Sequence, residues 1–303
     1  MASREEYRTY GGREVRLTNL HKVLFPADAI TKAELIDYVV TCSEPLLAAL
    51  RDRPLSMERR PDGLQGDGFF HKHKPAHFPD WVRTTLTPTS KGPMEQVVVD
   101  DLPALVLVTN FGCLTPHVPL STIGQAPDQL VVDLDPSIDD LGQVREAAHL
   151  VRARLEAFGL PSFARWSGSR GIHVVVPLDR SAPSEQVSAL ADAVAADLVL
   201  HHPALFTLEF RKALRGDRIY VDVGRNHPGA TVVASWAVRA RPTAPVAMPV
   251  GWDEVDHTGP RSFTVRTAPA RLALDPWPGF DAARVPGRTE VRGTSPSPSR
   301  SRA

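Results

Sequence analysis

The sequence predicts a mixed protein, α/β or α+β, in which short apolar strands alternate with amphipathic helices. Two observations carry this prediction. Short runs of strand-forming residues end at turn residues at 130–136, 163–166, 172–178 and 218–223. Between these runs, apolar residues recur every three or four positions at 141–158 and 187–198, which is the spacing of one helix face. The sequence contains no internal repeat.

The first helix is expected from about residue 32 to the low 40s. Thr31 and Glu34 form a capping-box pattern, with a hydroxyl at the cap and a carboxylate three residues later. Pro45 interrupts the apolar periodicity that follows, and a further turn or two of helix is expected at 46–50.

Local composition predicts the other elements. A strand or extended arm is expected at 15–19, and buried apolar segments at 97–99 and 105–108. Residues 51–80 are polar and contain several prolines and glycines, so we predict loops there. Ser184 is a candidate N-cap for the last helix.

Bulk composition is that of an ordinary soluble protein, because 42% of the 303 residues are hydrophobic and 23% are charged. No apolar run approaches the roughly 18 residues of a membrane-spanning helix, and the N-terminus lacks the apolar stretch of a secretory signal. Two cysteines suit a reducing cytoplasm and exclude a cysteine-rich zinc module. The net charge of zero is mild evidence against a nucleic-acid enzyme, although local basic clusters still bind phosphates.

Two acids lie on one predicted strand. Asp133 and Asp135 alternate with apolar residues, so both carboxylates point to the same side, and Pro136 ends the strand directly after them. Crowded carboxylates repel each other, and a bound divalent cation relieves that repulsion. All-oxygen ligands favour magnesium or manganese over zinc. The alternative is a strand end whose acids cap the following loop or helix.

A third acid, Asp222, lies in another apolar strand, where an unpaired charge is costly. If it converges on Asp133 and Asp135, the three carboxylates complete a two-metal site. Such a site drives in-line displacement at phosphorus. The sequence therefore predicts phosphoryl or nucleotidyl transfer at the place where these strands meet.

A polar turn at 167–173 lies between two predicted strands and contains two glycines, which let the backbone approach a ligand closely. Its donors to phosphate oxygens are Ser167, Ser169, Arg170 and His173. The alternative is a flexible hairpin turn with a histidine at its base.

Three further residues are candidates for ligand contacts. His117, which is flanked by prolines, either donates to a phosphate or is a hydrogen-bonded structural residue. Phe69 and Phe70 precede a run of histidines and lysines, which suits base stacking with neutralisation of the phosphate backbone. The alternative is that the two rings anchor a surface loop. A zinc site at the neighbouring histidines is disfavoured, because no cysteine or acid lies close by in sequence.

In combination and order, these motifs resemble those of the archaeo-eukaryotic primase superfamily, and the closest branch is the polymerase domain of bacterial ATP-dependent DNA ligase D. The resemblance covers about residues 12–280. The stretches that carry it are Leu17–Pro26, Phe69–Lys72, Asp133–Pro136, Ser167–His173 with Pro177 and Leu178, and Tyr220–Asp222 with Asn226.

The resemblance implies a primase-polymerase core with an RRM-like antiparallel sheet and a flanking α/β N-terminal part. We expect one domain at 1–283, with its N-terminal part at about 12–125 and its catalytic part at about 126–283. The tail at 284–303, rich in Gly, Ser, Pro, Thr and Arg, is expected to be disordered.

The resemblance also implies a function, the template-dependent addition of nucleotides to a primer 3′ end at breaks and gaps in non-homologous end joining. Asp133, Asp135 and Asp222 would bind two manganese or magnesium ions. The incoming NTP or dNTP would be held by His117, Ser167, Ser169, Arg170, His173 and Arg239, with Phe69 and Phe70 stacking on its base or sugar.

Contacts to DNA follow from the same resemblance. Lys22 and Lys32 match lysines that grip a 5′-phosphate on the downstream side of a gap, and Asn19, Lys72 and Arg215 complete the expected DNA-binding set. The expected partners are gapped or broken duplex DNA, Ku and a separate ATP-dependent ligase, with a cytoplasmic, nucleoid-associated location and no membrane contact.

The sequence departs from the resemblance at Arg225 and Arg170, and at Glu58 and Arg59, which occupy a region where relatives carry basic residues. Arg225 stands where relatives often carry glutamine, and Arg170 replaces a common lysine. Arginine and lysine differ in geometry and hydration, so nucleotide preference is expected to shift.

Two other functions compete with this one. A catalytically weak end-bridging module would bind DNA ends and recruit a ligase, but it would not need three carboxylates. A metal-dependent phosphoesterase would use the acids but not the predicted triphosphate-binding turn.

Overall fold

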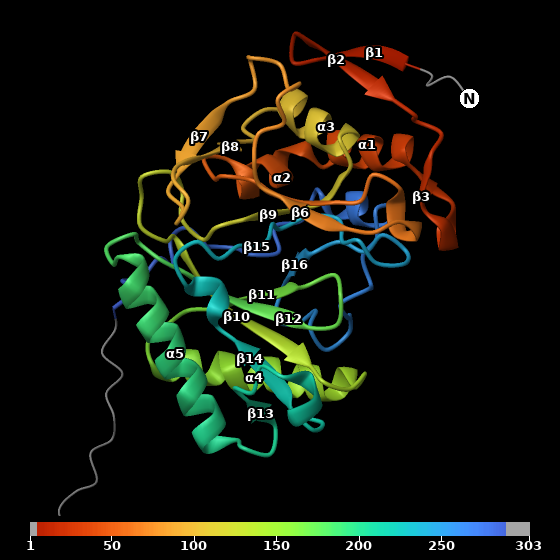
Figure 1. Ribbon diagram of the computed structural model, residues 1–303. Coiled ribbons are helices and arrows are strands. Elements are labelled where there is room, and N and C mark those ends of the chain that lie inside the picture. Colours follow the sequence, from red (N-terminus) through yellow and green to blue (C-terminus); the bar gives the residue numbers. More distant parts are fainter. Residues whose placement is uncertain (1–4, 289–303) are drawn as a thin grey trace, which may run out of the picture.

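The computed structural model describes residues 5–288, which form two packed parts (Figure 1). The N-terminal part carries α1 (Lys32–Thr41), α2 (Ser43–Leu50) and α3 (Leu102–Asn110) above a four-stranded sheet of order β15-β9-β5-β6. The strands of that sheet are β5 (Ser56–Arg59), β6 (Phe69–His71), β9 (Cys113–Val118) and β15 (Val232–Val233).

Three small antiparallel ladders surround this part. They are β1 (Glu5–Tyr10) with β2 (Arg13–Thr18), β3 (Val23–Phe25) with β4 (Ile30–Thr31), and β7 (Thr84–Thr87) with β8 (Met94–Val97). Short 3-10 turns are η1 (Pro26–Asp28), η2 (Gly63–Gln65), η3 (Lys212–Leu214), η4 (Gly224–Asn226) and η5 (Ala268–Arg271).

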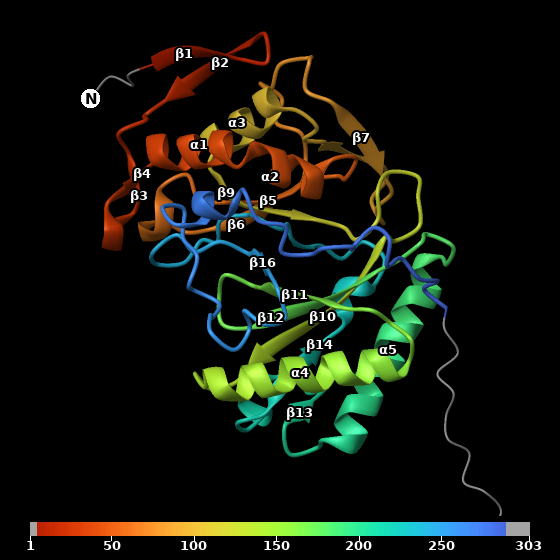
Figure 2. The same cartoon turned by 180° about the vertical axis from the view of Figure 1, so that it is seen from behind.

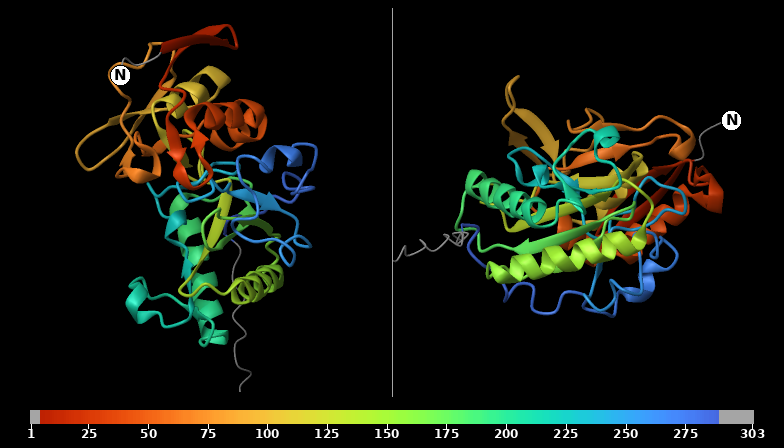
Figure 3. Two further views of the ribbon diagram at one scale, coloured as in Figure 1. Left: turned by 90° about the vertical axis from the view of Figure 1, so that its right-hand side faces the viewer. Right: turned by 90° about the horizontal axis from the view of Figure 1, so that it is seen from below.

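The second part is built on a six-stranded sheet of order β13-β14-β10-β12-β11-β16. Its strands are β10 (Gln129–Pro136), β11 (Phe163–Trp166), β12 (Ile172–Pro177), β13 (Phe206–Thr207), β14 (Ile219–Asp222) and β16 (Met248–Val250). The helices α4 (Leu141–Ala157) and α5 (Ser184–His201) cover the face turned away from the N-terminal part (Figures 2 and 3). The pairing is antiparallel except between β13 and β14, so the predicted antiparallel sheet has one parallel edge.

Local sequence signals explain where the helices begin. The predicted capping box is present, because Thr31 Oγ1 accepts from the Glu34 amide while the Glu34 carboxylate accepts from the Thr31 amide. Asp140 caps α4 in a similar way by accepting from the Gln143 amide. The apolar positions of α4 are buried against the sheet, as its periodicity predicts.

Two buried polar contacts fasten the parts together. Arg53, which follows α2, makes a bidentate ion pair at 2.7 Å with Asp128, just before β10. Tyr38 on α1 donates its hydroxyl to the carbonyl oxygen of Trp236 at 2.8 Å. Both contacts join segments far apart in the sequence, so they fix the orientation of the six-stranded sheet beneath the N-terminal part.

Several sequence predictions need correction. The segment 51–80, predicted as loops, contains β5 and β6, and Phe69 and Phe70 therefore lie on a strand. The apolar segment at 105–108 is buried as predicted, and it belongs to a helix, α3. Ser184 is the first residue of α5 rather than its cap, since Pro183 occupies the cap position. Helix α2 begins before Pro45, which its first turn accommodates because that position needs no intrahelical amide donor.

Two predicted boundaries also shift. The chain returns to the N-terminal sheet at β15, which pairs with Val118 and His117 on β9, so the two parts are not separated at residue 125. The tail was expected from 284, but the Val285 amide donates to Pro177 and its carbonyl oxygen accepts from the Asp179 amide. Ordered structure thus continues to at least 285, and 289–303 lie outside the described residues. Within residues 5–288, the helices are too short or too polar to span a bilayer.

Candidate active site

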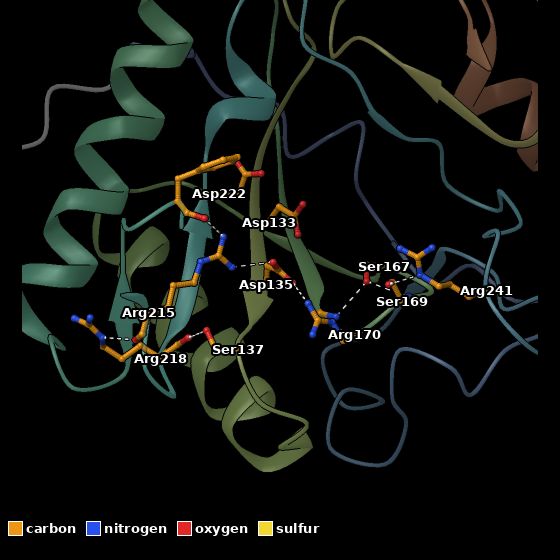
Figure 4. Close-up of polar contacts among 12 residues, drawn as sticks. Asp133, Asp135, Ser137, Ser167, Ser169, Arg170, Arg215, Arg218, Asp222 and Arg241 are labelled. Atoms are coloured by element: carbon orange, nitrogen blue, oxygen red, sulfur yellow. Dashed lines mark hydrogen bonds and ion pairs between the residues drawn. The ribbon is translucent and has the colours of Figure 1, made fainter. Parts of the chain in front are cut away.

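Three aspartates meet on neighbouring strands at the centre of the large sheet. Asp133 on β10 is the direct register partner of Asp222 on β14, and Asp135 is paired with Tyr220. Along β10 the acids are partly exposed, whereas Val132 and Leu134 between them are buried. The alternation predicted from sequence is therefore confirmed, and the pairing of β14 with β10 brings the third acid beside the first two (Figure 4).

The three acids line a cavity of about 460 Å³ that is rich in arginine. The arginines of its wall are Arg170, Arg215, Arg225, Arg239, Arg241 and Arg261. Six guanidinium groups against three carboxylates leave a surplus of positive charge. A polyanion such as a triphosphate is complementary to that surplus.

Arginines pair with each acid. Arg170 donates to Asp135 Oδ1 at 3.2 Å, and Arg215 donates to Asp135 Oδ2 at 3.0 Å from the opposite side (Figure 4). Arg225 lies 3.3 Å from Asp222 and 3.9 Å from Asp133. Each carboxylate thus has at least one guanidinium group within ion-pair distance.

Arg215 was predicted as a DNA contact, and the structure places it differently. Its side chain is 6% exposed, lies over the Tyr220 ring, and donates to the carbonyl oxygens of Glu209 and Phe210 as well as to Asp135. Arg215 thus connects the backbone at 209–210 to Asp135, one of the three acids (Asp133, Asp135 and Asp222) that form the acidic cluster. A role in contacting DNA requires a rearrangement of this side chain.

His173 lies between an arginine and an acid. It is the register partner of Asp133 on β12, with its Nε2 at 3.4 Å from Asp133 Oδ1. The Arg165 guanidinium lies 2.7 Å from the other ring nitrogen, Nδ1. Burial, and then the charge of Arg165, hold the pKa of His173 well below its usual value, so the ring is neutral. Its two nitrogens are engaged within the protein rather than presented to a triphosphate.

Asp133 has an unusual electrostatic environment for a carboxylate. Burial, followed by the neighbouring charge of Asp222, raises its pKa to about 7. The guanidinium of Arg225 opposes that shift. A divalent cation between Asp133 and Asp222 would favour the ionised form in the same way, because it adds positive charge beside both oxygens.

The polar turn at 167–173, called the serine turn below, is stabilised by its first residue, Ser167. The Ser167 hydroxyl accepts from the amides of Ser169 and Gly171 at 3.3 Å, and the Ser167 amide donates to the Gly171 carbonyl oxygen. A Cβ at Gly171 would lie 1.9 Å from the Leu134 carbonyl oxygen, so a side chain there is excluded. The turn therefore has internal hydrogen bonds of its own and a position that only glycine fits.

Positive side chains surround this turn. Arg239 donates to the Ser167 carbonyl oxygen, Arg241 to the Ser169 hydroxyl and Arg261 to the Ser169 carbonyl oxygen. Arg239 also has a buried Nε with no hydrogen-bond partner within the described chain. An unpaired buried donor beside this turn fits a site for an anionic ligand.

Phe70 and His117 pack together beside the cavity, whereas Phe69 lies on the opposite face of β6 with Arg59. Phe70 is 59% exposed and packs edge-on against His117, with 5.2 Å between ring centroids. Burial, then the charge of Arg239, lowers the pKa of His117 to about 3, so this ring is also neutral. Phe69 is 47% exposed under the Arg59 guanidinium, and Lys72 follows directly after β6. Exposed rings beside cations are suited to stacking on bases.

The predicted 5′-phosphate contacts line a different cavity, of about 510 Å³, in the N-terminal part. Asn19, Lys22 and Lys32 all contribute to its wall. Lys22 pairs with Asp62 at 2.5 Å, and the buried Lys32 ammonium donates to the Thr18 carbonyl oxygen at 2.8 Å. Burial, and then the charge of Lys22, lowers the pKa of Lys32 to about 8. The structure thus brings these three predicted residues together, away from the acids.

The acidic cluster has the ligand chemistry of a hard divalent cation, but its three carboxylates are not grouped closely enough in this structure to form a metal site. Its donors are carboxylate oxygens, which magnesium and manganese prefer. Across residues 5–288, no three His, Cys, Asp or Glu side chains are grouped closely enough to hold an ion. The same acids make ion pairs, in which Asp135 pairs with Arg170 and Arg215 and Arg225 lies near both Asp133 and Asp222.

Sequence reasoning missed several residues of this site. Arg165 had no motif around it, and its contact with His173 depends on the register between β11 and β12. Arg261 and the exposed ring of Phe210 also line the cavity, although neither belongs to a recognisable pattern. Arg241, which donates to the Ser169 hydroxyl, was likewise not among the sequence candidates. An arginine opposite a predicted active-site residue on the next strand is a useful signal. It can be found only when the register between the two strands is known.

Comparisons with known proteins agree on one family. Residues 31–277 match the family described as LigD, primase-polymerase domain. A bifunctional non-homologous end joining protein, LigD of Bacillus subtilis, is 31% identical over 277 residues, which are 90% of this chain and 45% of the relative. LigD of Mycolicibacterium smegmatis is 33% identical over 246 residues, which are 80% of this chain and 32% of the relative. The chain thus spans less than half the length of these curated relatives.

A solved structure supports the same fold. The polymerase domain from Mycobacterium tuberculosis Ligase D in complex with DNA is similar with a TM-score of 0.82 and 31% sequence identity. The match covers 89% of this chain and 99% of that chain. The mixed α/β fold predicted from the sequence is therefore confirmed.

Proposed function

Because this chain belongs to the LigD primase-polymerase family and is a nucleotidyltransferase, we propose that it extends primer 3′ ends at broken or gapped duplex DNA during end joining. The reaction proposed is template-dependent, in-line transfer of a nucleotide from an NTP or dNTP. The observation that carries the proposal is the pairing of Asp133 with Asp222 inside an arginine-rich cavity. This arrangement supplies carboxylates for cations and guanidinium groups for a triphosphate.

In this proposal, Asp133, Asp135 and Asp222 hold two manganese or magnesium ions. When bound, such ions neutralise charge at the attacking and leaving oxygens of the transfer. Arg170 and Arg215 must then release Asp135, and their guanidinium groups become available to anionic substrate. We propose that His173 keeps the Asp133 carboxylate in place through Nε2, which lies 3.4 Å from Asp133 Oδ1, while the Arg165 guanidinium fixes the ring at Nδ1.

The triphosphate is assigned to the serine turn and its arginines. Ser167 shapes the turn, while Ser169 and Arg170 present donors to the cavity. Arg239 offers the guanidinium whose Nε lacks a partner in the described chain. Phe69 and Phe70 are assigned to the base or sugar of the nucleotide, and of the two rings Phe70 packs against His117. His173, predicted as a triphosphate contact, is better placed to position Asp133.

DNA is assigned to two regions. The cavity at Asn19, Lys22 and Lys32 would take the 5′-phosphate downstream of a gap, since it gathers two lysines, and burial, followed by the charge of Lys22, lowers the pKa of Lys32. Lys72 would contact the phosphate backbone of DNA next to Phe69 and Phe70. We propose that Arg215 contacts DNA only after its ion pair with Asp135 has broken.

Assembly and location are proposals of the same kind. Curated relatives are named for non-homologous end joining, which suits a chain that works with Ku and a separate ATP-dependent ligase on DNA in the bacterial cytoplasm. We propose that residues 1–283 act as one primase-polymerase domain. The cross-connection through β15 supports this, because the catalytic segment completes the N-terminal sheet.

A primer-extension assay tests the function. The substrate is a gapped duplex with a 5′-phosphate downstream of the gap, supplied with NTPs or dNTPs and with manganese or magnesium. Templated extension with release of pyrophosphate is expected, whereas release of inorganic phosphate indicates a phosphoesterase. Tight binding of the gapped duplex without any incorporation in manganese indicates an end-bridging module instead.

A further inference from the structure

Arg225 lies beside the paired acids Asp133 and Asp222, and the turn η4 fixes its backbone there. It lies in η4, immediately after β14. The next residue, Asn226, is buried, and its side-chain amide exchanges hydrogen bonds with the backbone of Val131 on β10 at 2.7 and 2.8 Å. On the other side, the Gly224 amide donates to Asp222 at 3.0 Å. The backbone of this turn is therefore fixed to both strands that carry the acids.

The Arg225 side chain spans Asp133 and Asp222. Its Nη2 lies 3.3 Å from Asp222 Oδ2, and its Nε lies 3.9 Å from Asp133 Oδ2. The guanidinium thus lies within ion-pair distance of both carboxylates, which are the groups that would hold a shared cation. The side chain is 45% exposed, so it has a path out toward solvent and the cavity.

We propose that Arg225 is an internal counter-ion for the Asp133–Asp222 pair and competes with the divalent cation for it, an inference that rests on the metal-dependent function proposed above. Two facing carboxylates repel each other, and one guanidinium relieves that repulsion when no ion is bound. A divalent ion on the same oxygens is repelled by the guanidinium at short range, so Arg225 must move away as the ion binds.

The displaced guanidinium has an evident new partner. Arg225 lines the same cavity as the serine turn and the arginines assigned to the triphosphate. A triphosphate bound there offers it oxygens in place of the carboxylates. Cation and triphosphate binding are then coupled, and by linkage each strengthens the other by the same factor. The chain without nucleotide is expected to bind the cation weakly.

Manganese binding to the protein without nucleotide or DNA tests this competition directly. Titrations followed by electron paramagnetic resonance would compare the parent chain, Arg225→Gln, Arg261→Gln and Asp222→Asn. Arg225→Gln is expected to bind Mn²⁺ about tenfold more tightly, which corresponds to loss of one charge-assisted contact. Arg261→Gln is the matched control, because Arg261 lines the same cavity but donates to the Ser169 carbonyl oxygen. Its effect is expected to stay within about threefold, as for a screened charge at longer range.

The results separate this inference from the proposed function. If Asp222→Asn abolishes Mn²⁺ binding while Arg225→Gln binds no more tightly than Arg261→Gln, the metal site stands and the counter-ion role is wrong. If Asp222→Asn binds Mn²⁺ like the parent, the ion lies elsewhere and both proposals fall.

A measurement on the unmutated protein covers the case in which Arg225→Gln fails to fold. The Nε–H signal of Arg225 in a nitrogen-15 NMR spectrum is expected to shift on addition of saturating Mg²⁺, whereas that of Arg53, in its buried pair with Asp128, is expected to stay unchanged. An Arg225 signal that Mg²⁺ leaves in place would contradict displacement.

Discussion

His173 Nε2 lies 3.4 Å from Asp133 Oδ1, across the register between β12 and β10. Arg165 approaches the opposite ring nitrogen at 2.7 Å, and because a guanidinium has no acceptor, His173 Nδ1 must accept. The single proton of the neutral ring therefore faces Asp133. This chain of contacts assigns His173 to positioning a carboxylate.

Replacement of His173 by alanine tests that assignment. We expect kcat of primer extension to fall about 100-fold, because Asp133 loses its donor, while KM for the nucleotide changes less than about threefold. Loss of the buried partner of Arg165 should also lower the free energy of unfolding by about 2–4 kcal/mol. Steady-state kinetics and urea denaturation give the three values. A KM increase of tenfold or more with kcat preserved would instead support direct contact with the triphosphate.

Asp135→Ala is expected to reduce extension by about 1000-fold or more, since it removes a carboxylate of the proposed metal site. Binding of gapped DNA should be preserved or tighter, because Arg170 and Arg215 lose their acidic partner. Extension rates and fluorescence anisotropy measure the two effects. Asp139→Ala removes an exposed acid from the neighbouring cavity and serves as the control. Extension by Asp135→Ala at the parent rate would refute the metal assignment.

Recognition of a 5′-phosphate should weaken as the pH rises through about 8. Burial lowers the pKa of Lys32 to that value, so the ammonium is charged below it and neutral above it. A terminal phosphate gains its second charge near pH 6, and the preference for phosphorylated over unphosphorylated gaps is therefore expected to be greatest between about pH 6 and 8. The ratio of the two Kd values, measured from pH 6 to 9.5, checks this. Lys32→Ala should remove both the preference and its pH dependence.

Arg53→Ala should destabilise the protein strongly. The Arg53–Asp128 pair is buried, with side chains 8% and 6% exposed, and its loss leaves Asp128 with only the partly exposed Arg180 as an ionic partner among the described residues. A decrease of about 3–5 kcal/mol in the free energy of unfolding is expected. Arg83→Ala breaks exposed pairs with Asp52 and Asp100 and should cost less than about 1 kcal/mol. Equal shifts in denaturation midpoint for the two variants would contradict the importance of burial.

Acid should destabilise the native state in part through His117. Its pKa is lowered from 6.5 to about 3 on folding, so below pH 6.5 the unfolded chain binds a proton that the native chain does not. The free energy of unfolding therefore falls with decreasing pH, by at most about 1.4 kcal/mol per pH unit for this group. Denaturation of the parent and of His117→Gln between pH 7 and 4.5 measures the difference. Parallel pH profiles would show that His117 titrates normally in the folded protein.

Local patterns predicted those features that depend on neighbouring residues in the chain. The alternation of Asp133 and Asp135 with buried residues placed both acids on one face, and the pair Thr31 and Glu34 located the start of α1. Patterns failed where a segment gains its structure from distant partners. The strand at Phe69 and Phe70 has little β pattern of its own and forms by pairing with Met57–Arg59 on β5.

The sequence alone determined the mixed fold, the shared face of Asp133 and Asp135, and the family to which its motifs point, since strand periodicity and motif order are properties of the chain itself. Tertiary structure decided which charges meet. Arg215 reaches Asp135 across 80 positions of sequence, and Arg165 reaches His173 by strand register. Such contacts follow from the packing of β10 between β12 and β14, which no local pattern encodes. For that reason the acids were predictable, and Arg170 and Arg215 were candidate site residues, but the pairing of each guanidinium group with its acid was not predictable.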